Sequence, residues 1–149
     1  MGRTIRQRLQ QERFEGPAHE AALGVLLAAA HLREQVEHAV GIAGITLQQY
    51  NVLRILRGVA PGGYPRGEIA RRMIERAPDL TRMLDRLVRD GLVERVRSER
   101  DARLSVARIT RKGLAALDRI GPRMEEMHHE LAGRLGERDA RTLVRICER

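Results

Sequence analysis

The chain contains very few cysteine and aromatic residues. Among its 149 residues there are one cysteine, Cys147, no tryptophan, two tyrosines and one phenylalanine. A single cysteine excludes an internal disulfide framework and a metal site built from several cysteines. The scarcity of aromatic side chains argues against a surface for single-stranded nucleic acid, because such surfaces stack the bases on exposed rings.

Long apolar runs are also missing. The longest one, residues 21–30, has ten residues and includes Gly24, whereas a helix that spans a bilayer needs about 20 apolar residues. The basic N-terminal segment leads into no apolar stretch with a small-residue cleavage site, so no secretion signal is indicated. We therefore expect a cytoplasmic protein without a transmembrane helix.

Positive charge is abundant. The chain has 28 Lys and Arg residues against 20 Asp and Glu residues, a net charge of +8, and 42% of its residues are hydrophobic. This balance is typical of one globular domain that binds a polyanion. Arginine suits phosphates and guanine edges, but a GC-rich genome also raises the arginine content. Composition alone therefore does not distinguish nucleic-acid binding from codon usage. Because aromatic residues are scarce, duplex nucleic acid is favoured over single strands.

The first third of the chain indicates an arm followed by two helices. Residues 1–17 form a polar, basic arm, and apolar residues at three- and four-residue spacings then predict a long helix from Ala18 to about Val40. Thr46 and Gln49 have the spacing of a capping box, in which each side chain binds a free amide at the start of a helix. A second helix therefore begins there and ends at Gly58.

Two shorter helices are predicted next. The third starts at Pro65 and ends before Ala77-Pro78. Its side chains expected to point into the core are Ile69, Ala70, Met73 and Ile74. The fourth starts near Pro78 or Asp79 and ends at Gly91. On one face it carries the apolar stripe Leu80, Leu84, Leu87 and Val88, and on the other the polar set Thr81, Arg82, Asp85, Arg86 and Arg89.

The remainder predicts a hairpin and two helices. Residues 92–97 and 104–109 are strand-like and are joined by a charged turn. Thr110 caps a fifth helix that runs towards Leu135 with a bend at Gly121-Pro122, and residues 137–148 form a sixth. The predicted fold is therefore mainly α with a small β-hairpin wing, a winged helix-turn-helix plus a helical dimerisation region.

This order of elements predicts how DNA would be bound. In a helix-turn-helix the later of the two helices, here the fourth predicted helix, offers one face to the major groove, where arginine can pair with guanine. A thin cationic hairpin can enter the minor groove. A charged helix is more often only a solvated face, but helix, hairpin and sign of charge together favour DNA. The predicted DNA-binding residues are Thr81, Arg82, Asp85, Arg86, Arg97, Arg100, Asp101 and Arg103, with Asp101 orienting Arg103.

Over residues 18–149 the sequence resembles the MarR (multiple antibiotic resistance regulator) family. The resemblance is carried by residues 45–53 (ITLQQYNVL), 81–87 (TRMLDRL), 91–95 (GLVER), 101–103 (DAR) and 109–113 (ITRKG). The Asp-x-Arg of the wing, followed by Thr-x-x-Gly where the next helix begins, is the most specific part. The resemblance implies a two-fold dimer held by terminal helices, repression from a palindromic operator, and release by a small aromatic or anionic ligand.

These implications divide the chain into four parts. They are the arm (1–17), a dimerisation helix (18–45), the DNA-binding domain (46–110) and C-terminal dimerisation helices (111–149). A dimer also follows from the apolar residues of the first, fifth and sixth helices, which exceed what a small wing domain covers. We expect an effector pocket where the first and fifth helices meet the DNA-binding domain, lined by His31, Tyr50, Val52 and Tyr64.

Three other interpretations deserve comparison. Glu125 and His129 are four residues apart and could share a helix face, which leaves a zinc-responsive regulator of the same fold as an alternative. A non-catalytic helical interaction protein is the second alternative, although it gives no reason for the arginines of the fourth helix and hairpin. An enzyme is not expected, because no nucleophile with a base and no phosphate-binding glycine loop is visible. No cofactor is expected either. The single cysteine, Cys147, is far from the N-terminus, where peroxide-sensing members of the family carry theirs.

Overall fold

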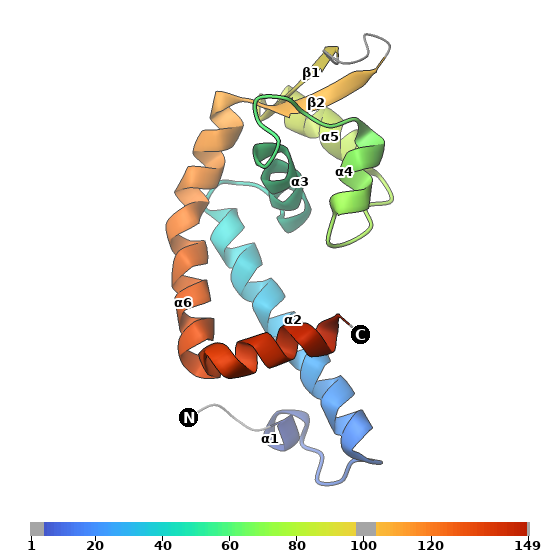
Figure 1. Cartoon of the computed structure of the whole chain (residues 1–149), viewed down its shortest axis with the longest axis vertical. Helices are drawn as coiled ribbons and strands as arrows, with labels where there is room; N and C mark the ends of the chain where they lie inside the picture. Colours follow the sequence, from blue (N-terminus) through green and yellow to red (C-terminus); the bar gives the residue numbers. More distant parts are fainter. Residues whose placement is uncertain (1–4, 98–103, 149) are drawn as a thin grey trace. The chain divides into compact units, whose positions relative to one another are not determined.

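The computed structural model describes residues 5–97 and 104–148, and in these residues it is mostly helical with one two-stranded antiparallel sheet (Figure 1). The predicted fold class is confirmed. The chain forms two compact units, one ending at His38 and the other beginning at Ala39. None of the described helices is both long and apolar enough to cross a lipid bilayer.

The first unit consists of the arm and most of the long helix. It contains α1 (Ile5–Leu9) and the greater part of α2 (Pro17–Gly41). Arg6 lies over the ring of Phe14 at 5.6 Å and faces Glu20 at 3.6 Å, while Phe14 meets the ring of His19 edge-on at 5.9 Å. None of the described residues up to 38 is buried. The arm thus docks on the beginning of α2 without forming a core.

The second unit is built around α3 (Leu47–Arg57), which contacts α4, α6 and β2. The predicted capping box is present: the Gln49 amide donates to Thr46 Oγ1 at 3.2 Å, and the Thr46 amide donates to Gln49 Oε1 at 2.9 Å. Val52, Leu53 and Leu56 are at most 1% exposed. The local signal therefore sets the start of the helix that forms the centre of the core.

The third predicted helix is shorter than its apolar spacing indicates. The helix α4 covers only Arg66–Arg72, and Met73 already has extended backbone angles. The amide of Ile74 donates to the Asn51 side chain of α3 at 3.0 Å, which holds the chain outside the helix. The prediction that Ala70 and Ile74 point inward was wrong: Ala70 is exposed and the Ile74 side chain is 86% exposed.

The hairpin has the predicted place and nearly the predicted length. Strands β1 (Val93–Arg97) and β2 (Ser105–Ile109) pair antiparallel with Val93 opposite Ile109. Tyr64 forms an additional bridge with Ala107 of β2. Gly63 precedes that bridge with a φ of +131°, and a Cβ there would lie 2.6 Å from the Ala107 carbonyl oxygen. Only glycine lets the loop approach the sheet so closely.

The last helix, α6 (Arg111–Cys147), is capped by Thr110, whose hydroxyl accepts from the Gly113 amide at 3.1 Å. It combines the predicted fifth and sixth helices, which meet at a kink at Gly136 (φ 66°, ψ 164°), where α6 changes direction (Figure 1). The predicted bend at Gly121-Pro122 is not where the helix breaks, because backbone angles stay helical through Pro122.

Candidate nucleic-acid interface

The helix α5 (Leu80–Arg89) has one buried and one exposed face. Leu80, Leu84 and Leu87 are at most 4% exposed and attach the helix to the core. Residues three and four apart lie on the same helix face, so the remaining positions share the opposite side. That side carries the exposed residues Thr81, Arg82, Asp85, Arg86 and Arg89. The separation into faces that the sequence predicts is confirmed.

The three arginines of this face differ in their partners. Arg82 lies 3.3 Å from Asp79, which precedes the helix, and Arg89 lies 3.6 Å from the neighbouring Asp90. Over residues 5–97 and 104–148, the side chain of Arg86 forms no ion pair or hydrogen bond. As far as the described residues are concerned, its guanidinium is therefore the one on α5 that can bind a new partner without first leaving an acidic neighbour.

An ion pair connects this face to the hairpin. Arg95, in the middle of β1, donates from Nη2 to Oδ1 of Asp85, and both side chains are about half exposed. Sequence reasoning placed Asp85 at the interface but missed Arg95. A signal was available, because alternate residues of a strand share a face and Arg95 lies two residues before Arg97, which was predicted to bind DNA.

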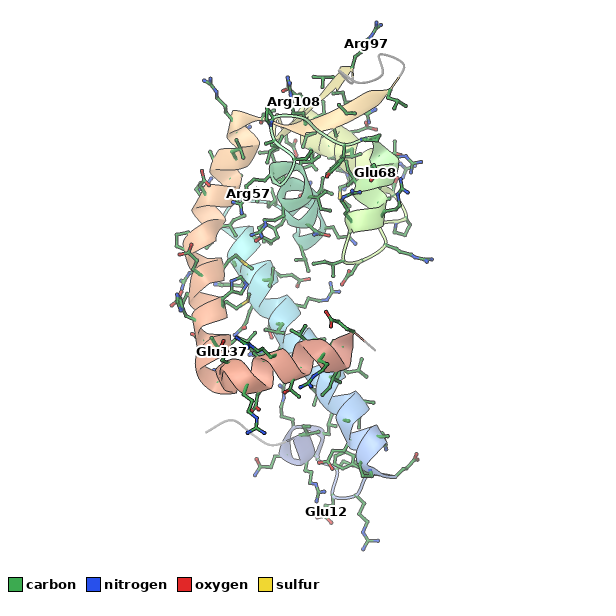
Figure 2. The ribbon with its side chains drawn as sticks, in the orientation of Figure 1. Glu12, Arg57, Glu68, Arg97, Arg108 and Glu137 are labelled. Atoms are coloured by element: carbon green, nitrogen blue, oxygen red, sulfur yellow. The ribbon has the colours of Figure 1, made fainter. Side chains whose placement is uncertain are left out.

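The hairpin carries one predicted DNA-binding residue that can be located. Arg97 is exposed at the end of β1, opposite Ser105, and projects away from the rest of the second unit (Figure 2). The other three, Arg100, Asp101 and Arg103, lie outside the described residues. The last residue of β1 therefore presents a cation to solvent.

A hollow of about 240 Å³ lies where α4, α5 and the hairpin meet. Two arginines, a threonine and a serine are among the residues that line it, and Leu84 and Ala107 are its apolar residues. Its lining residues are Arg66, Thr81, Leu84, Arg95, Ser105 and Ala107. Guanidinium and hydroxyl groups are donors that suit phosphate oxygens. Sequence reasoning found only Thr81 among the polar members, although Arg66 opens the first helix of the motif, which crosses the DNA backbone in such folds.

A small charged cluster on α4 includes Arg72, which contacts a tyrosine that is bridged to the hairpin. Glu68, labelled in Figure 2, pairs with both Arg71 and Arg72. The hydrogen bond from Arg72 lowers the pKa of the Glu68 carboxyl below its ordinary value. Arg72 also lies over the ring of Tyr64 at 4.4 Å, and Tyr64 is bridged to β2. The ion pairs of Glu68 lie within α4, and the contact of Arg72 with Tyr64 connects the helix to the sheet.

The net positive charge of the chain is confined to the second unit. Residues 1–38 carry five basic and five acidic residues, whereas residues 39–149 carry 23 basic and 15 acidic residues. The excess of +8 therefore belongs wholly to the unit that contains α5 and the hairpin. Such a separation of charge favours an electrostatic function of this unit over a uniform effect of codon usage.

The residues predicted to line an effector pocket belong to different units. His31 is exposed on α2 in the first unit, while Tyr50, Val52 and Tyr64 belong to the second. Val52 is 0% exposed and forms part of the core, and the Tyr50 hydroxyl accepts a hydrogen bond of 3.4 Å from Arg54. Tyr50, Val52 and Tyr64 each have a structural role within the second unit, and binding of a ligand stays a prediction.

The alternative metal site has few possible ligands nearby. Glu125 and His129 are both exposed on α6. In the described ranges 5–97 and 104–148, no three His, Cys, Asp or Glu side chains gather closely enough to hold a metal ion. A zinc site at this pair would need ligands from elsewhere, such as a second copy of the chain.

Known proteins resemble both the sequence and the fold. The MarR family model matches residues 45–105, from two residues before α3 to the start of β2. A MarR transcription factor from Planctomyces limnophilus is 32% identical, and the alignment covers 91% of this chain and 98% of that one, with a TM-score of 0.67. The HTH-type transcriptional regulator FarR of Neisseria gonorrhoeae is 28% identical over 114 residues, which are 76% of this chain and 77% of FarR.

The fold is also similar to that of a protein solved with its nucleic acid. The S. aureus MepR–DNA complex has a TM-score of 0.74, covering 85% of this chain and 91% of MepR. At 18% identity this likeness concerns the fold alone. The arrangement of α3, α4, α5 and the hairpin is thus one that occurs in a DNA-binding protein.

Proposed function

The chain belongs to the MarR family of winged-helix, DNA-binding transcriptional regulators, and from this premise we propose that it is a repressor that binds a pseudo-palindromic operator as a homodimer. A small-molecule effector would release it from DNA. The proposal assigns it no catalytic activity and places it in the cytoplasm. The observation that carries it is the exposed face of α5, where Arg86 has no partner among the described residues and Thr81 and Arg82 lie beside it.

The geometry supports reading of the major groove by α5. Its buried leucines fix the helix to the core, so the opposite face is the one that can enter a groove. Arg86 can donate two hydrogen bonds to a guanine edge, while Arg97 at the hairpin supplies charge to the neighbouring groove. We propose Thr81, Arg82 and Arg86 as base-contacting residues, and Arg97, Arg100 and Arg103 as wing contacts.

Selection from random duplexes tests the function directly. The full chain is incubated with a random double-stranded library, and the bound fraction is sequenced. We expect enrichment of two inverted half-sites whose centres are about 10 base pairs apart, because two reading helices of a symmetric dimer lie about 34–36 Å apart. Enrichment of no sequence would refute a specific regulator, and enrichment of single half-sites would refute the dimer.

The dimer is proposed on apolar side chains that the single chain leaves exposed. On the terminal part of α6, Leu143, Val144 and Ile146 are 44–58% exposed, and on α2 Val25 and Leu26 are 59% and 66% exposed. Several large apolar side chains exposed on two helices are typical of a surface that another protein covers. We expect light scattering at micromolar concentration to give the mass of two chains.

A double substitution tests which surface forms the dimer. Val144→Glu with Ile146→Glu should weaken dimerisation by about 30-fold or more, because truncated or charged central contacts commonly cost that much. Arg138→Glu, on the same helical segment but at an exposed charged position, is the control and should stay dimeric. A double variant with an unchanged dimer constant would show that α6 does not form the interface.

An effector is the last part of the proposal. We expect aromatic carboxylates such as benzoate or 4-hydroxybenzoate to lower operator affinity about tenfold at saturation, a typical coupling between two sites. This effect requires that the effector binds the DNA-free state of the protein more tightly than the DNA-bound state. His31→Ala, Tyr50→Phe and Tyr64→Phe should reduce it, while His38→Ala, another exposed α2 histidine, should not. Titration of operator binding with each acid measures this, and no response to any of them would contradict the proposal.

A further inference from the structure

The ion pair between Asp85 and Arg95 differs from the other ion pairs of α5. Arg82 and Arg89 pair with acidic residues one to three positions away in the sequence, whereas Arg95 reaches Asp85 from a different element, β1. The Arg95 Nη2 donates to a single carboxylate oxygen, Oδ1. The pair therefore connects the helix that would read DNA with the strand that leads to the wing.

Folding does not depend on this pair. The helix α5 and strand β1 already contact each other, Leu87 and Val93 are buried, and the Leu92 amide donates to the Leu87 carbonyl at 2.9 Å. Both charged side chains are half exposed, 59% for Asp85 and 47% for Arg95. Ion pairs in such positions contribute little to stability. The pair is thus better explained by what it holds in place.

The pair holds in place the guanidinium of Arg95, which is one of the residues that line the hollow. Arg95 lines that hollow together with Arg66, Thr81 and Ser105. Each of these four residues has a side chain that can donate to a phosphate oxygen. Arginine has many rotamers, and ordering such a side chain on binding reduces affinity. A carboxylate that orders Arg95 beforehand removes part of that loss.

We infer that Arg95 contacts a DNA phosphate beside the groove that α5 enters, and that Asp85 is a positioning residue that orders Arg95 for this contact without reading a base. The inference rests on the proposed DNA-binding function. It explains why the helix carries an acidic residue among its arginines, although a carboxylate facing phosphates would otherwise reduce affinity. We therefore expect that replacing Asp85 weakens operator binding only when Arg95 is present.

The test uses Asp85→Asn, Arg95→Gln and the double variant of the full chain. Affinity is measured at several salt concentrations for the selected operator and for a scrambled duplex. Asp85→Asn should weaken operator binding about threefold to tenfold, the usual effect of ordering one long side chain. Its scrambled-duplex affinity should not fall, because the protein has gained one positive charge. Arg95→Gln should weaken both and reduce the salt slope by roughly 0.9, as for one lost phosphate contact.

In the Arg95→Gln background, adding Asp85→Asn should no longer weaken operator binding, because no guanidinium remains to be ordered. Arg95→Lys should keep most of the operator affinity, since one donor is enough for the observed contact. The matched control is Glu94→Gln, which makes the same charge change on β1 and breaks the similarly exposed pair with Arg108. It should leave operator binding unchanged or slightly tighter.

Three outcomes would overturn the inference. Tighter operator binding by Asp85→Asn in both backgrounds would mean that the carboxylate only repels DNA. A changed preference at one base pair, without an effect of Arg95→Gln, would make Asp85 a direct reader. If Asp85→Asn lowered the melting temperature together with the operator affinity, Asp85 would have a packing role. If the wild-type chain enriches no sequence, the proposed function itself fails, which is a distinct result.

Discussion

Replacing Gly113 with alanine is expected to lower the free energy of unfolding by about 3 kcal/mol, the upper part of the range for overpacked sites. A Cβ at this position would lie 2.3 Å from the Leu92 carbonyl oxygen and 2.7 Å from a side-chain carbon of Ile109. The oxygen belongs to the backbone and also accepts from the Thr110 amide at 3.1 Å. The start of α6 and the start of the hairpin must therefore move apart to admit a methyl group.

Urea unfolding of the variant and of a matched glycine variant measures this. Gly67→Ala is the control, because Gly67 is also helical but a Cβ there would meet nothing within 4 Å. Alanine is the better helix former, so this control should be unchanged or more stable by up to about 1 kcal/mol. Equal stability of the two variants would show that α6 does not approach the hairpin as closely as described.

Replacing Arg86 with alanine is expected to weaken operator binding by about 1–3 kcal/mol and to relax the preference at one or two base pairs. Arg86 has no ion pair or hydrogen bond within the described ranges, so its loss leaves no acidic partner exposed. Binding to scrambled duplexes should change less. Arg82→Ala should act in the same direction but more weakly, because Arg82 must leave Asp79 before it can contact a base.

A substitution in the hairpin should change DNA binding in a different way. Arg97→Ala removes a cation from a groove that is recognised by shape and potential, so affinity should fall for all sequences and the salt dependence should become shallower. Titrations of operator and scrambled duplexes at several salt concentrations separate the two effects. Arg123→Ala, on α6 and paired with Glu126 at 2.7 Å, is the control. Wild-type values for both Arg86→Ala and Arg97→Ala would mean that DNA binds elsewhere.

Features with a local cause were predictable from the sequence. The capping box of Thr46 and Gln49 needs only residues three apart, and it sets the start of α3 as expected. The two faces of α5 follow from helical spacing, and its leucines are buried as predicted. The candidate site on α5 depends on the same spacing, so its exposed residues were found together.

Features with a tertiary cause were not predictable in the same way. The early end of α4 depends on a hydrogen bond from the Ile74 amide to Asn51, 23 residues away, which the apolar spacing does not reveal. The role of Arg95 depends on the side chain of Asp85 in another element. The kink of α6 was expected at Gly121-Pro122, yet proline is accommodated there and the break comes at Gly136.

Gly136 also bears on how the sequence can vary. In a saturation mutagenesis experiment, exposed positions without neighbours normally accept many residues, and Gly136 is exposed with nothing within 4 Å of an added Cβ. Its backbone angles, φ 66° and ψ 164°, nevertheless belong to a region that is essentially reserved for glycine. A scan ranked by burial or by contacts would therefore assign this position high tolerance, although the direction of the whole terminal segment of α6 depends on it.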